Sequence, residues 1–498
     1  PPPRTEPPPS AASRAGVVLL VVARGLQCRL DAAWWCAGGA LGASLLFLLG
    51  KGAGPWALMV PALVLAALLP ARAQFYRRSR LLAEPFTPAW LAAVGVVLLA
   101  ALWLLRVGHA GADLWGQAWW AFALDAEAAR SLRAAVGSVA LVLGVGLHQL
   151  LAPPPLPAAP ADAQAVGRAL PIIEASPLTY ANLALRGDKA LLFSDTGQAF
   201  LMYACHGRSC VAMGDPVGDE AGARELAWRF REMCDRAGMA CAFFEVGPQR
   251  RDFYASLGLG FTCVGSEARV DLQAFRLEAP AHKGLRHERS RLARLGCSVE
   301  IVPREGVAAL LPQLREVSDA WLATRPTREK GFSSASFDPA YLCRFPVVLV
   351  RRGQEVLAFA NLWLGAGRHE LSIDLMRHLP QSPHGTMDLL FSELMLWGRA
   401  QGYRWFDFGM APLHGVGDAG DARLWVRTAG ILYRHGRRFY NFEGLQRYKQ
   451  KFQPVWTPMY LACPGGLALP QVLLDVAAVV AGGVGGLVPR PRRRRTRP

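Results

Sequence analysis

Charged side chains are scarce in this sequence. They make up 19% of its 498 residues, whereas hydrophobic residues make up 52%. A soluble enzyme of this length usually contains about a quarter charged residues. The composition therefore disfavours a wholly soluble chain and predicts that part of it lies in a lipid bilayer. The length still leaves room for two or three domains with cores of their own.

Acidic residues are the scarcer of the two charged kinds. The sequence contains 38 Asp and Glu residues and 55 Lys and Arg residues, which gives a net charge of +17. An excess of this size favours polyanionic partners, namely nucleic acid, anionic lipid or both. Basic loops beside membrane helices and a basic tail account for part of the excess.

Paired-cysteine motifs are also missing. The ten cysteines are scattered, and no CxxC pair occurs. Cys205, His206 and Cys210 lie close together, but no second ligand pair follows at the spacing of a zinc site. We therefore expect no metal, and we expect free thiols in a reducing cytosol. We expect no secretory signal either, because the first residues lack a basic region and a cleavage site.

Long hydrophobic runs are present, and they gather in residues 1–152. Several approach the roughly 20 residues that span a hydrocarbon core, which predicts a multi-pass segment of four to five transmembrane helices. Arginines follow the first and third runs, and because basic loops stay in the cytoplasm, everything after residue 152 is expected there. A proline-rich linker, 153–162, would act as a stiff spacer. The runs are 16–23, 32–49, 55–69, 89–105 and 132–151.

The rest of the sequence alternates between strand-like and helix-like periods, which is typical of an α/β fold. Three strands, a helix, a strand, a helix and a strand are expected over 163–290, and a similar order recurs over 291–465. The repetition predicts two tandem GNAT-like (acetyltransferase-type) units in the cytosol. The expected strands are 190–193, 199–205, 209–213, 241–246 and 261–271 in the first unit, and 346–351, 355–364, 368–376 and 403–408 in the second.

Residues 466–498 are expected to form an apolar helix and a polybasic tail. The helix could pack on the core, but an interfacial helix with a basic anchor would suit an enzyme whose substrate is an anionic lipid.

Ordinary acetyl transfer is disfavoured by the loop 378–385. An acetyl-CoA enzyme needs glycines and backbone N–H groups at this place to bind the pyrophosphate. Here the loop reads HLPQSPHG, and its two prolines remove backbone donors.

Asp374 and Arg377 are the first candidates for the chemistry. They lie three residues apart at the end of an expected strand. A carboxylate and a guanidinium so placed could bind an ammonium group and a phosphate or carbonyl oxygen, respectively. The alternative is a structural ion pair at the end of the strand.

A second candidate group follows near the C-terminus. Glu443, Arg447 and Lys451 repeat every four residues, so on a helix they would share one face. Lys449 and several aromatic residues are interleaved with them. This pattern suits a stacked base or an anionic headgroup, although a solvated amphipathic face has the same pattern.

Several segments resemble those of a known family. They include VAMGDPVG, ELSIDLMRH, PHGTMDLLF, FDFGMAPL and YNFEGLQRYKQKFQPVWTPMYLA. The chain resembles the multiple peptide resistance factor family, the bifunctional phosphatidylglycerol lysyltransferases and flippases of bacteria. The family's upstream flippase helices are mostly missing here, so lipid translocation is not expected of this chain alone.

The resemblance implies transfer of an amino acid, by preference lysine, from aminoacyl-tRNA to the glycerol hydroxyl of phosphatidylglycerol. The reaction needs no cofactor, because the ester is already activated. It would lower the negative charge of the membrane and confer resistance to cationic antimicrobial peptides. The implied location is the inner (cytoplasmic) membrane, with the catalytic part in the cytoplasm.

Roles for the candidate residues follow from the same resemblance. Asp374 is assigned to the amino group or the base, Arg377 to a phosphate or the oxyanion, and Glu443 is a rival base. The residues expected to hold tRNA or lipid phosphates are Arg447, Lys449 and Lys451. Weaker candidates are Asp407, His206, His378 and His384.

Two other functions remain open at this stage. The GLQRYKQKF element also resembles the Fem-type tRNA-dependent ligases, which would act on a lipid-linked peptidoglycan precursor. A non-catalytic membrane scaffold that binds tRNA or lipid is the other. No residue marks the charge of the amino-acid pocket, so lysine, alanine and arginine all remain possible donors.

Overall fold

The structure is a computed structural model with two compact units. One comprises Pro1–Leu156 with Asp235–Gly238, and the other comprises Pro157–Cys234 and Met239–Pro498. The described residues are 23, 26, 29–50, 54–77, 156, 158–324, 332–333, 336–415 and 442–481.

The described part of the first unit consists mainly of two apolar helices, α2 (Asp31–Gly50) and α3 (Pro55–Leu68). They pack side by side, and the indole of Trp34 donates a 2.8 Å hydrogen bond to the carbonyl of Leu68. Among the described residues, α2 is the one helix long and apolar enough to cross a membrane. The expected runs 16–23, 89–105 and 132–151 lie outside the described residues, apart from Ala23.

A single sheet of twelve strands forms the frame of the second unit. Its order is β1-β2-β3-β5-β12-β6-β11-β10-β9-β8-β7, and β4 pairs with β2 beside this path. The strands are β1 (Ala190–Phe193), β2 (Ala199–His206), β3 (Ser209–Met213), β4 (Val217–Gly218), β5 (Ala240–Val246), β6 (Gly260–Asp271), β7 (Cys297–Val302), β8 (Val347–Arg352), β9 (Glu355–Leu364), β10 (Glu370–His378), β11 (Trp405–Pro412) and β12 (Val455–Cys463).

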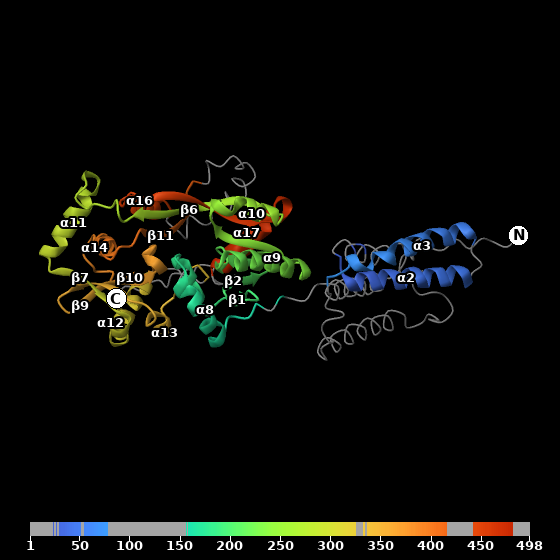
Figure 1. Ribbon diagram of the computed structural model, residues 1–498, viewed down its shortest axis with the longest axis horizontal. Helices are drawn as coiled ribbons and strands as arrows, with labels where there is room; N and C mark the ends of the chain where they lie inside the picture. The colour runs from blue at the N-terminus through green and yellow to red at the C-terminus, as the bar shows by residue number, and fades with distance from the viewer. Residues whose placement is uncertain are drawn as a thin grey trace, which may run out of the picture. The chain divides into compact units, whose positions relative to one another are not determined.

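Two similar halves make up this sheet, and each gives a strand to the other. In the first half β3 and β5 are parallel, and in the second β10 and β11 are parallel. Strand β6, from the first half, then pairs with β11, whereas β12, from the end of the chain, lies between β5 and β6. Figure 1 shows β6 between the two halves. The mixed α/β, GNAT-like architecture is confirmed, and residue 290 lies inside a helix between the halves.

Helices cover the sheet. They are α8 (Ala163–Ala175), α9 (Glu220–Arg236), α10 (Arg251–Ser256), α11 (Lys283–Arg294), α12 (Arg304–Ala323), α13 (Pro339–Leu342), α14 (Thr386–Ala400), α16 (Phe442–Gln450) and α17 (Leu469–Val480). Each expected strand begins within two residues of its predicted start, because its apolar residues are buried as the period-2 pattern requires. The sequence interpretation did not include β7, β12, α8, α11 or α12.

The apolar helix expected after residue 466 is α17. Its side chains Val472, Leu473 and Val476 are buried, and the helix packs against β2 and β3. The structure therefore places this helix on the core of the sheet, which is the alternative to an interfacial position.

One expectation about cysteines is wrong. Cys205 and Cys210 lie directly opposite each other on the antiparallel strands β2 and β3 and form a disulfide. The expected free thiols are found at seven other described cysteines. In the part of the chain that the structure describes, no three His, Cys, Asp or Glu residues are grouped in a way that would hold a metal ion.

Candidate active site

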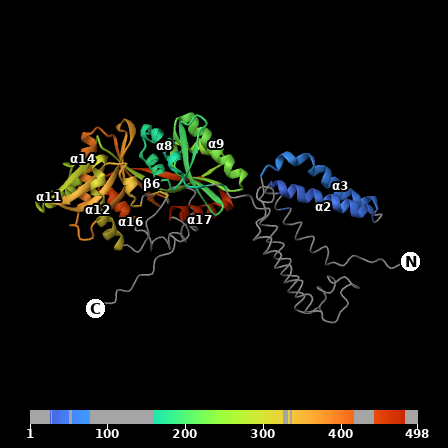
Figure 2. The same cartoon turned by 90° about the horizontal axis from the view of Figure 1, so that it is seen from below.

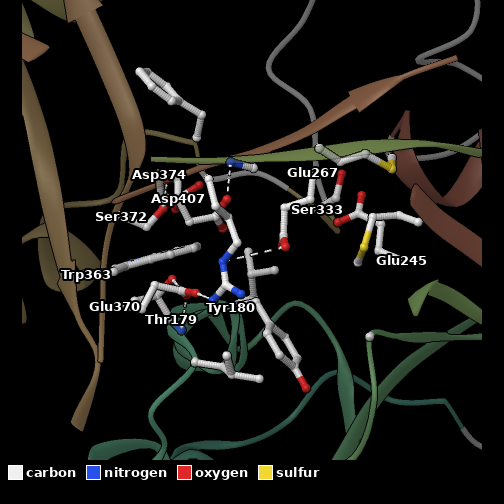
Figure 3. Close-up of a pocket in the computed structure, with 18 of the residues that line it drawn as sticks. Thr179, Tyr180, Glu245, Glu267, Ser333, Trp363, Glu370, Ser372, Asp374 and Asp407 are labelled. Atoms are coloured by element: carbon white, nitrogen blue, oxygen red, sulfur yellow. Dashed lines mark hydrogen bonds and ion pairs between the residues drawn. The ribbon is translucent and has the colours of Figure 1, made fainter. Parts of the chain in front are cut away.

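A cavity of about 460 Å³ lies where both parallel strand pairs diverge. The pairing of β3 with β5 ends at Met213 and Phe244, and that of β10 with β11 ends at Ser372 and Asp407. Residues at and beyond these ends line the cavity, together with parts of β6, β12 and α16. Both halves of the sheet therefore contribute to one site (Figure 3).

Bulges in the strands place carboxylates in this cavity. Glu245 falls at a register shift between β5 and β12 and has a φ of +62°, a conformation rare for residues other than glycine. Asp374 falls at a shift in β10, and Asp407 begins another in β11. Bulges bend a strand and change the direction of its side chains, and they are frequent beside active sites.

Asp374 is held by an aromatic hydrogen-bond chain. The Tyr341 hydroxyl donates a 2.8 Å hydrogen bond to Asp374 Oδ2, and the Trp363 indole donates to the Tyr341 oxygen at 3.2 Å. Tyr341 belongs to the short helix α13, whose first turn is capped by the Asp338 side chain. Burial raises the pKa of Tyr341 well above its usual value, so the phenol keeps its proton and remains a donor.

The charges of three further carboxylates act on one buried lysine, Lys449. The pKa of Glu245 is raised to about 7 and that of Glu267 to about 8. Burial is the largest cause in both cases, and the negative charge of Asp407 is the second. Burial also raises the pKa of Asp407. The same burial lowers the pKa of Lys449 to about 8, although all three carboxylates act against this. Several of these groups can therefore change charge near neutral pH.

Lys449 is fixed by backbone oxygens of the bulge in β11. Its ammonium group donates to the carbonyls of Gly409 and Met410 at 2.8 and 3.2 Å. Gly409 has a φ of +71°, and its N–H donates to Asp407 Oδ1 at 2.8 Å. The bulge thus fixes both Asp407 and Lys449.

The other cation of the described lining is Arg269 on β6. Its guanidinium pairs with the carboxylate of Glu370, which is only 3% exposed. The N–H and hydroxyl of Thr179 donate to the other carboxylate oxygen of Glu370 at 2.9 and 2.6 Å. Arg269 Nε also lies 3.7 Å from Glu267. These contacts fix the guanidinium at the junction of the halves.

The end of the cavity formed by the first half contains Asp215. Tyr254 donates to its side chain at 2.6 Å, and Tyr180 donates to its carbonyl at 2.9 Å. Gly214 precedes it with a φ of +67°, and a Cβ at that position would lie 2.7 Å from the Tyr180 ring. The MGD part of the VAMGDPVG segment, residues 213–215, is therefore part of the cavity wall.

The structure separates the first pair of candidates, Asp374 and Arg377. Asp374 lines the cavity, whereas Arg377 is not among the lining residues. The Arg377 guanidinium lies 4.2 Å from the centre of the Trp321 ring and donates to the carbonyl of Met376 at 2.9 Å. The bulge at Asp374 interrupts the alternation of side chains along β10, and Arg377 lies beyond it, outside the cavity lining. Asp407, a weaker candidate, does line the cavity.

Most of the second group lies in the helix α16, but its cations have different surroundings. Lys449 is 4% exposed and lines the cavity. Lys451 follows the helix and pairs with Asp388 of α14 at 2.9 Å. Arg447 is exposed. Glu443 lies in the helix, and its side chain is outside the described residues.

The three histidines named as weaker candidates are not among the lining residues. His206 ends β2 and His378 ends β10. His384 is 86% exposed in the loop before α14.

Sequence reasoning did not find five of the polar groups around the cavity. For Glu245 a signal exists, because it is the one charged residue in the apolar strand ACAFFEV. Tyr341 gives no such signal, since it lies in an ordinary aromatic and apolar segment. The residues missed are Tyr341, Glu245, Glu267, Arg269 and Glu370.

Comparison with known proteins assigns this architecture to a family. Residues 171–463 match the family model described as phosphatidylglycerol lysyltransferase, C-terminal. Phosphatidylglycerol lysyltransferases of Bacillus subtilis and Staphylococcus aureus are each 34% identical over 300 residues, which are 60% of this chain. Those residues are 35% and 36% of the two relatives, so the match covers about a third of the length of these curated proteins.

Two solved structures are similar over nearly their whole length. A C-terminal DUF2156 domain from Agrobacterium fabrum is 40% identical, with a TM-score of 0.60, and the match covers 65% of this chain and 99% of that one. The L-PGS structure from Bacillus licheniformis is 31% identical, with a TM-score of 0.59, covering 66% and 99%.

Proposed function

The chain belongs to the phosphatidylglycerol lysyltransferase C-terminal family, and from this membership we propose that it transfers lysine from lysyl-tRNA to a glycerol hydroxyl of phosphatidylglycerol. The relatives named above are lysyltransferases by description. The new ester would replace the ester that joins the amino acid to the tRNA, so neither ATP nor a cofactor is needed.

The acidic character of the cavity is the observation that carries the choice of lysine. Its described lining contains six carboxylates and two cations, Arg269 and Lys449. A lysyl group brings an α-ammonium and an ε-ammonium, and each is stabilised by buried carboxylates. An alanyl group has no second charge to compensate. The carboxylates are Asp215, Glu245, Glu267, Glu370, Asp374 and Asp407.

Asp374 is proposed to bind the α-ammonium. Its hydrogen bond from Tyr341 fixes its direction, and it lies at the diverging end of β10. A carboxylate held in one orientation places the ester carbonyl for attack, which is the positioning part of catalysis.

A carboxylate with a raised pKa is proposed as the general base. A base works best when its pKa lies near the working pH, and Glu245 and Glu267 have pKa values of about 7 and about 8. The hydroxyl oxygen attacks the ester carbon, the base takes the hydroxyl proton, and the bond to the ribose oxygen breaks. The proton then passes to that released oxygen.

Cations are proposed to stabilise the developing oxyanion and the phosphates. Arg269 lines the cavity and is fixed by Glu370, which suits it to an oxyanion. Arg377 is assigned to fixing β10 through Trp321. Arg447, exposed on α16, is kept as a phosphate contact.

The membrane arrangement is part of the same proposal. Helix α2 meets the length and composition of a span, and we propose that the further apolar runs make the segment multi-pass. The catalytic unit would then lie on the cytoplasmic side of the inner membrane, where aminoacyl-tRNA is available.

Thin-layer chromatography of lipids tests the function. The purified full chain is mixed with phosphatidylglycerol vesicles and, in separate reactions, with lysyl-, alanyl- or arginyl-tRNA. A ninhydrin-positive phospholipid formed chiefly from lysyl-tRNA is expected, and Asp374→Asn should reduce it about a hundredfold. Product on a lipid-linked peptide precursor alone, labelled product from acetyl-CoA, or no product from any tRNA would overturn the proposal.

A further inference from the structure

Thr179 is a buried residue of the first half to which the proposed mechanism gives no role. It begins the short helix η2 (Thr179–Arg186) and is 1% exposed. Its backbone N–H and its hydroxyl both donate to Oε1 of Glu370, at 2.9 and 2.6 Å. Glu370 begins β10 in the second half, 191 positions further along the chain. The two halves therefore meet at one carboxylate, and Figure 3 shows Thr179 beside it.

Glu370 connects Thr179 to the guanidinium of Arg269. Its Oε1 accepts both bonds from Thr179, and its Oε2 pairs with the guanidinium. The residue is only 3% exposed, so water cannot readily replace a donor that is lost. Hydrogen bonds to an ionised carboxylate are shorter and stronger than bonds between neutral groups. The direction of the Glu370 carboxylate, and through it the position of Arg269, thus depends on Thr179.

The segment before Thr179 fits closely against the second half. The N–H of Ala366, in the turn between β9 and β10, donates to the carbonyl of Ser176 at 2.8 Å. A Cβ on Gly365 would lie 2.3 Å from the carbonyl oxygen of Pro177. The φ of Gly365 is −76°, which any residue can adopt, so glycine is required there for space alone. This close fit fixes the backbone that leads into Thr179.

Helix η2 also contacts the second half at its other end and forms part of the cavity wall. Arg186 donates to the hydroxyl of Ser336 at 3.2 Å. Thr179 and Tyr180 line the cavity, and the Tyr180 hydroxyl donates to the carbonyl of Asp215 in the first half at 2.9 Å. This helix therefore joins the wall formed by the first half to the charged pair at the junction.

Arg269 itself lies where the two halves exchange strands. Its strand β6 pairs with β11 on one side and with β12 on the other. Figure 1 and Figure 2 both show β6 between α9 of the first half and α14 of the second. A small shift of one half against the other would therefore move this guanidinium relative to the carboxylates of the cavity.

We propose that Thr179 is a positioning residue for the transfer reaction. Through Glu370, it holds the Arg269 guanidinium where the oxyanion of the attacked ester develops. The role of Arg269 rests on the proposed function. A charged donor that is already oriented stabilises an oxyanion without reorganisation during the reaction, whereas a misplacement of about 1 Å can cost about a hundredfold in rate.

A purely structural contact between the halves is the alternative. Loss of the Thr179 hydroxyl would then lower the stability of the fold and leave the chemical step unchanged. A positioning role instead lowers kcat, because the oxyanion forms only after the lysyl-tRNA has bound. An interaction made only in the transition state affects kcat and leaves the KM of the substrate nearly unchanged.

Steady-state kinetics with the full chain, phosphatidylglycerol vesicles and lysyl-tRNA test the proposal. Thr179→Val removes the hydroxyl and keeps the branched shape, whereas Thr179→Ser keeps the hydroxyl. Thr386→Val is the matched control. Thr386 is 4% exposed, and its hydroxyl donates to the carbonyl of Pro383 at 2.7 Å, outside the cavity lining.

The hydroxyl of Thr179 should matter for kcat alone. In Thr179→Val, kcat should fall about tenfold, as expected for a lost hydrogen bond to a charged group, and the KM for lysyl-tRNA should change less than about twofold. Thr179→Ser should restore most of the native kcat. The control Thr386→Val should keep both constants.

A second pair of variants displaces Thr179 without replacing it. In Gly365→Ala the new methyl group would push Pro177 away, and Thr179 with it. Gly465→Ala is the control, because Gly465 has a similar φ of −79° and nothing within 4 Å of a Cβ. Gly365→Ala should reproduce the loss of kcat, and Gly465→Ala should not.

The rate at which phenylglyoxal modifies Arg269 gives a readout that needs no turnover. This reagent attacks guanidinium groups, and a guanidinium held by a buried carboxylate reacts slowly. Mass spectrometry of the peptides separates Arg269 from the other arginines. Its modification should be about tenfold faster in Thr179→Val than in the native chain and unchanged in Thr386→Val.

A native kcat, or a native rate of Arg269 modification, in Thr179→Val would overturn the inference. So would an equal loss of kcat in Thr386→Val, or a Thr179→Ser variant as slow as Thr179→Val, since either would assign the effect to packing. A native chain that forms no aminoacyl lipid refutes the proposed function, and the modification rates still decide whether Thr179 holds Arg269. The two proposals therefore fail separately.

Discussion

The hydroxyl of Tyr341 lies 2.8 Å from Asp374 Oδ2, although 33 positions separate the two residues in the chain. Tyr341 comes from a four-residue helix and Asp374 from a bulge in β10. The contact therefore depends on how the helix packs on the strand. It gives the carboxylate a fixed direction in the cavity.

Replacing Tyr341 with phenylalanine should reduce transfer to lipid. The ring would still pack against Phe345, but Asp374 would lose a hydrogen bond to a charged group, worth about 1.5–3 kcal/mol. A loss of about tenfold to a hundredfold in kcat/KM for lysyl-tRNA is expected. Tyr403→Phe is the control, because Tyr403 is buried outside the cavity lining. Equal rates in the two variants would show that the hydrogen bond to Asp374 has no role.

Binding of a lysyl side chain should strengthen as the pH rises. Glu245 and Glu267 are neutral below their pKa values of about 7 and about 8, and they become anionic above them. Calorimetry with lysine methyl ester should therefore show tighter binding at pH 8.5 than at pH 6, by about tenfold. Norleucine methyl ester has the same α-amine without the ε-ammonium and serves as the control ligand. The double variant Glu245→Gln, Glu267→Gln should remove the difference between the two ligands' pH profiles.

Glu267 should make the native chain less stable at alkaline pH. The folded chain raises the pKa of Glu267 from 4.5 to about 8, so it binds this proton more tightly than the unfolded chain does. The contribution of Glu267 to stability is therefore fully present below its unfolded pKa of 4.5 and is lost as the pH rises through about 8. Glu267→Gln should raise the melting temperature at pH 9 more than at pH 6. A stabilisation that is independent of pH would contradict this assignment.

The two lysines after Arg447 should behave differently. Lys449 is buried and bound to backbone carbonyls, so Lys449→Ala should disturb the bulge at Gly409 and reduce transfer. Lys451 pairs with Asp388, whose side chain is only 7% exposed, so Lys451→Ala should leave a buried carboxylate without its cation and cost about 1–3 kcal/mol of stability. Neither change should alter the salt dependence of RNA binding. A lower slope for either variant, in filter binding at several salt concentrations, would restore a phosphate contact at that position.

Gly214 should tolerate alanine poorly. Its φ of +67° disfavours any side chain, and a Cβ would also lie 2.7 Å from the Tyr180 ring. Gly258 has a similar φ of +75° with nothing within 4 Å of a Cβ, so Gly258→Ala measures the backbone strain alone, about 1–2 kcal/mol. Gly214→Ala should be more destabilising than this and should also reduce transfer. Equal free energies of unfolding would show that the Tyr180 ring moves away without a penalty.

Much of the fold could be predicted from local patterns. Strands such as β8 and β9 are apolar over most of their length and begin within a residue of their expected starts, because burial on both faces requires such runs. The four-residue repeat of Glu443 and Arg447 is compatible with a helix, and both residues lie in α16. Asp374 could be named because a carboxylate three residues before an arginine, at the end of an expected strand, could bind a charged substrate.

The tertiary structure alone decided how the site is assembled. Strand β12 lies between β5 and β6, and this pairing joins segments about 200 residues apart that no local period connects. It brings Glu245 and Glu267 near Lys449, where shared burial moves their pKa values toward neutrality. Arg377 packs on the Trp321 ring outside the cavity, and the packing of α13 gives Asp374 its partner Tyr341 instead. Local sequence sets the period of each element, whereas the partners of a strand depend on which distant surfaces bury the most apolar area together.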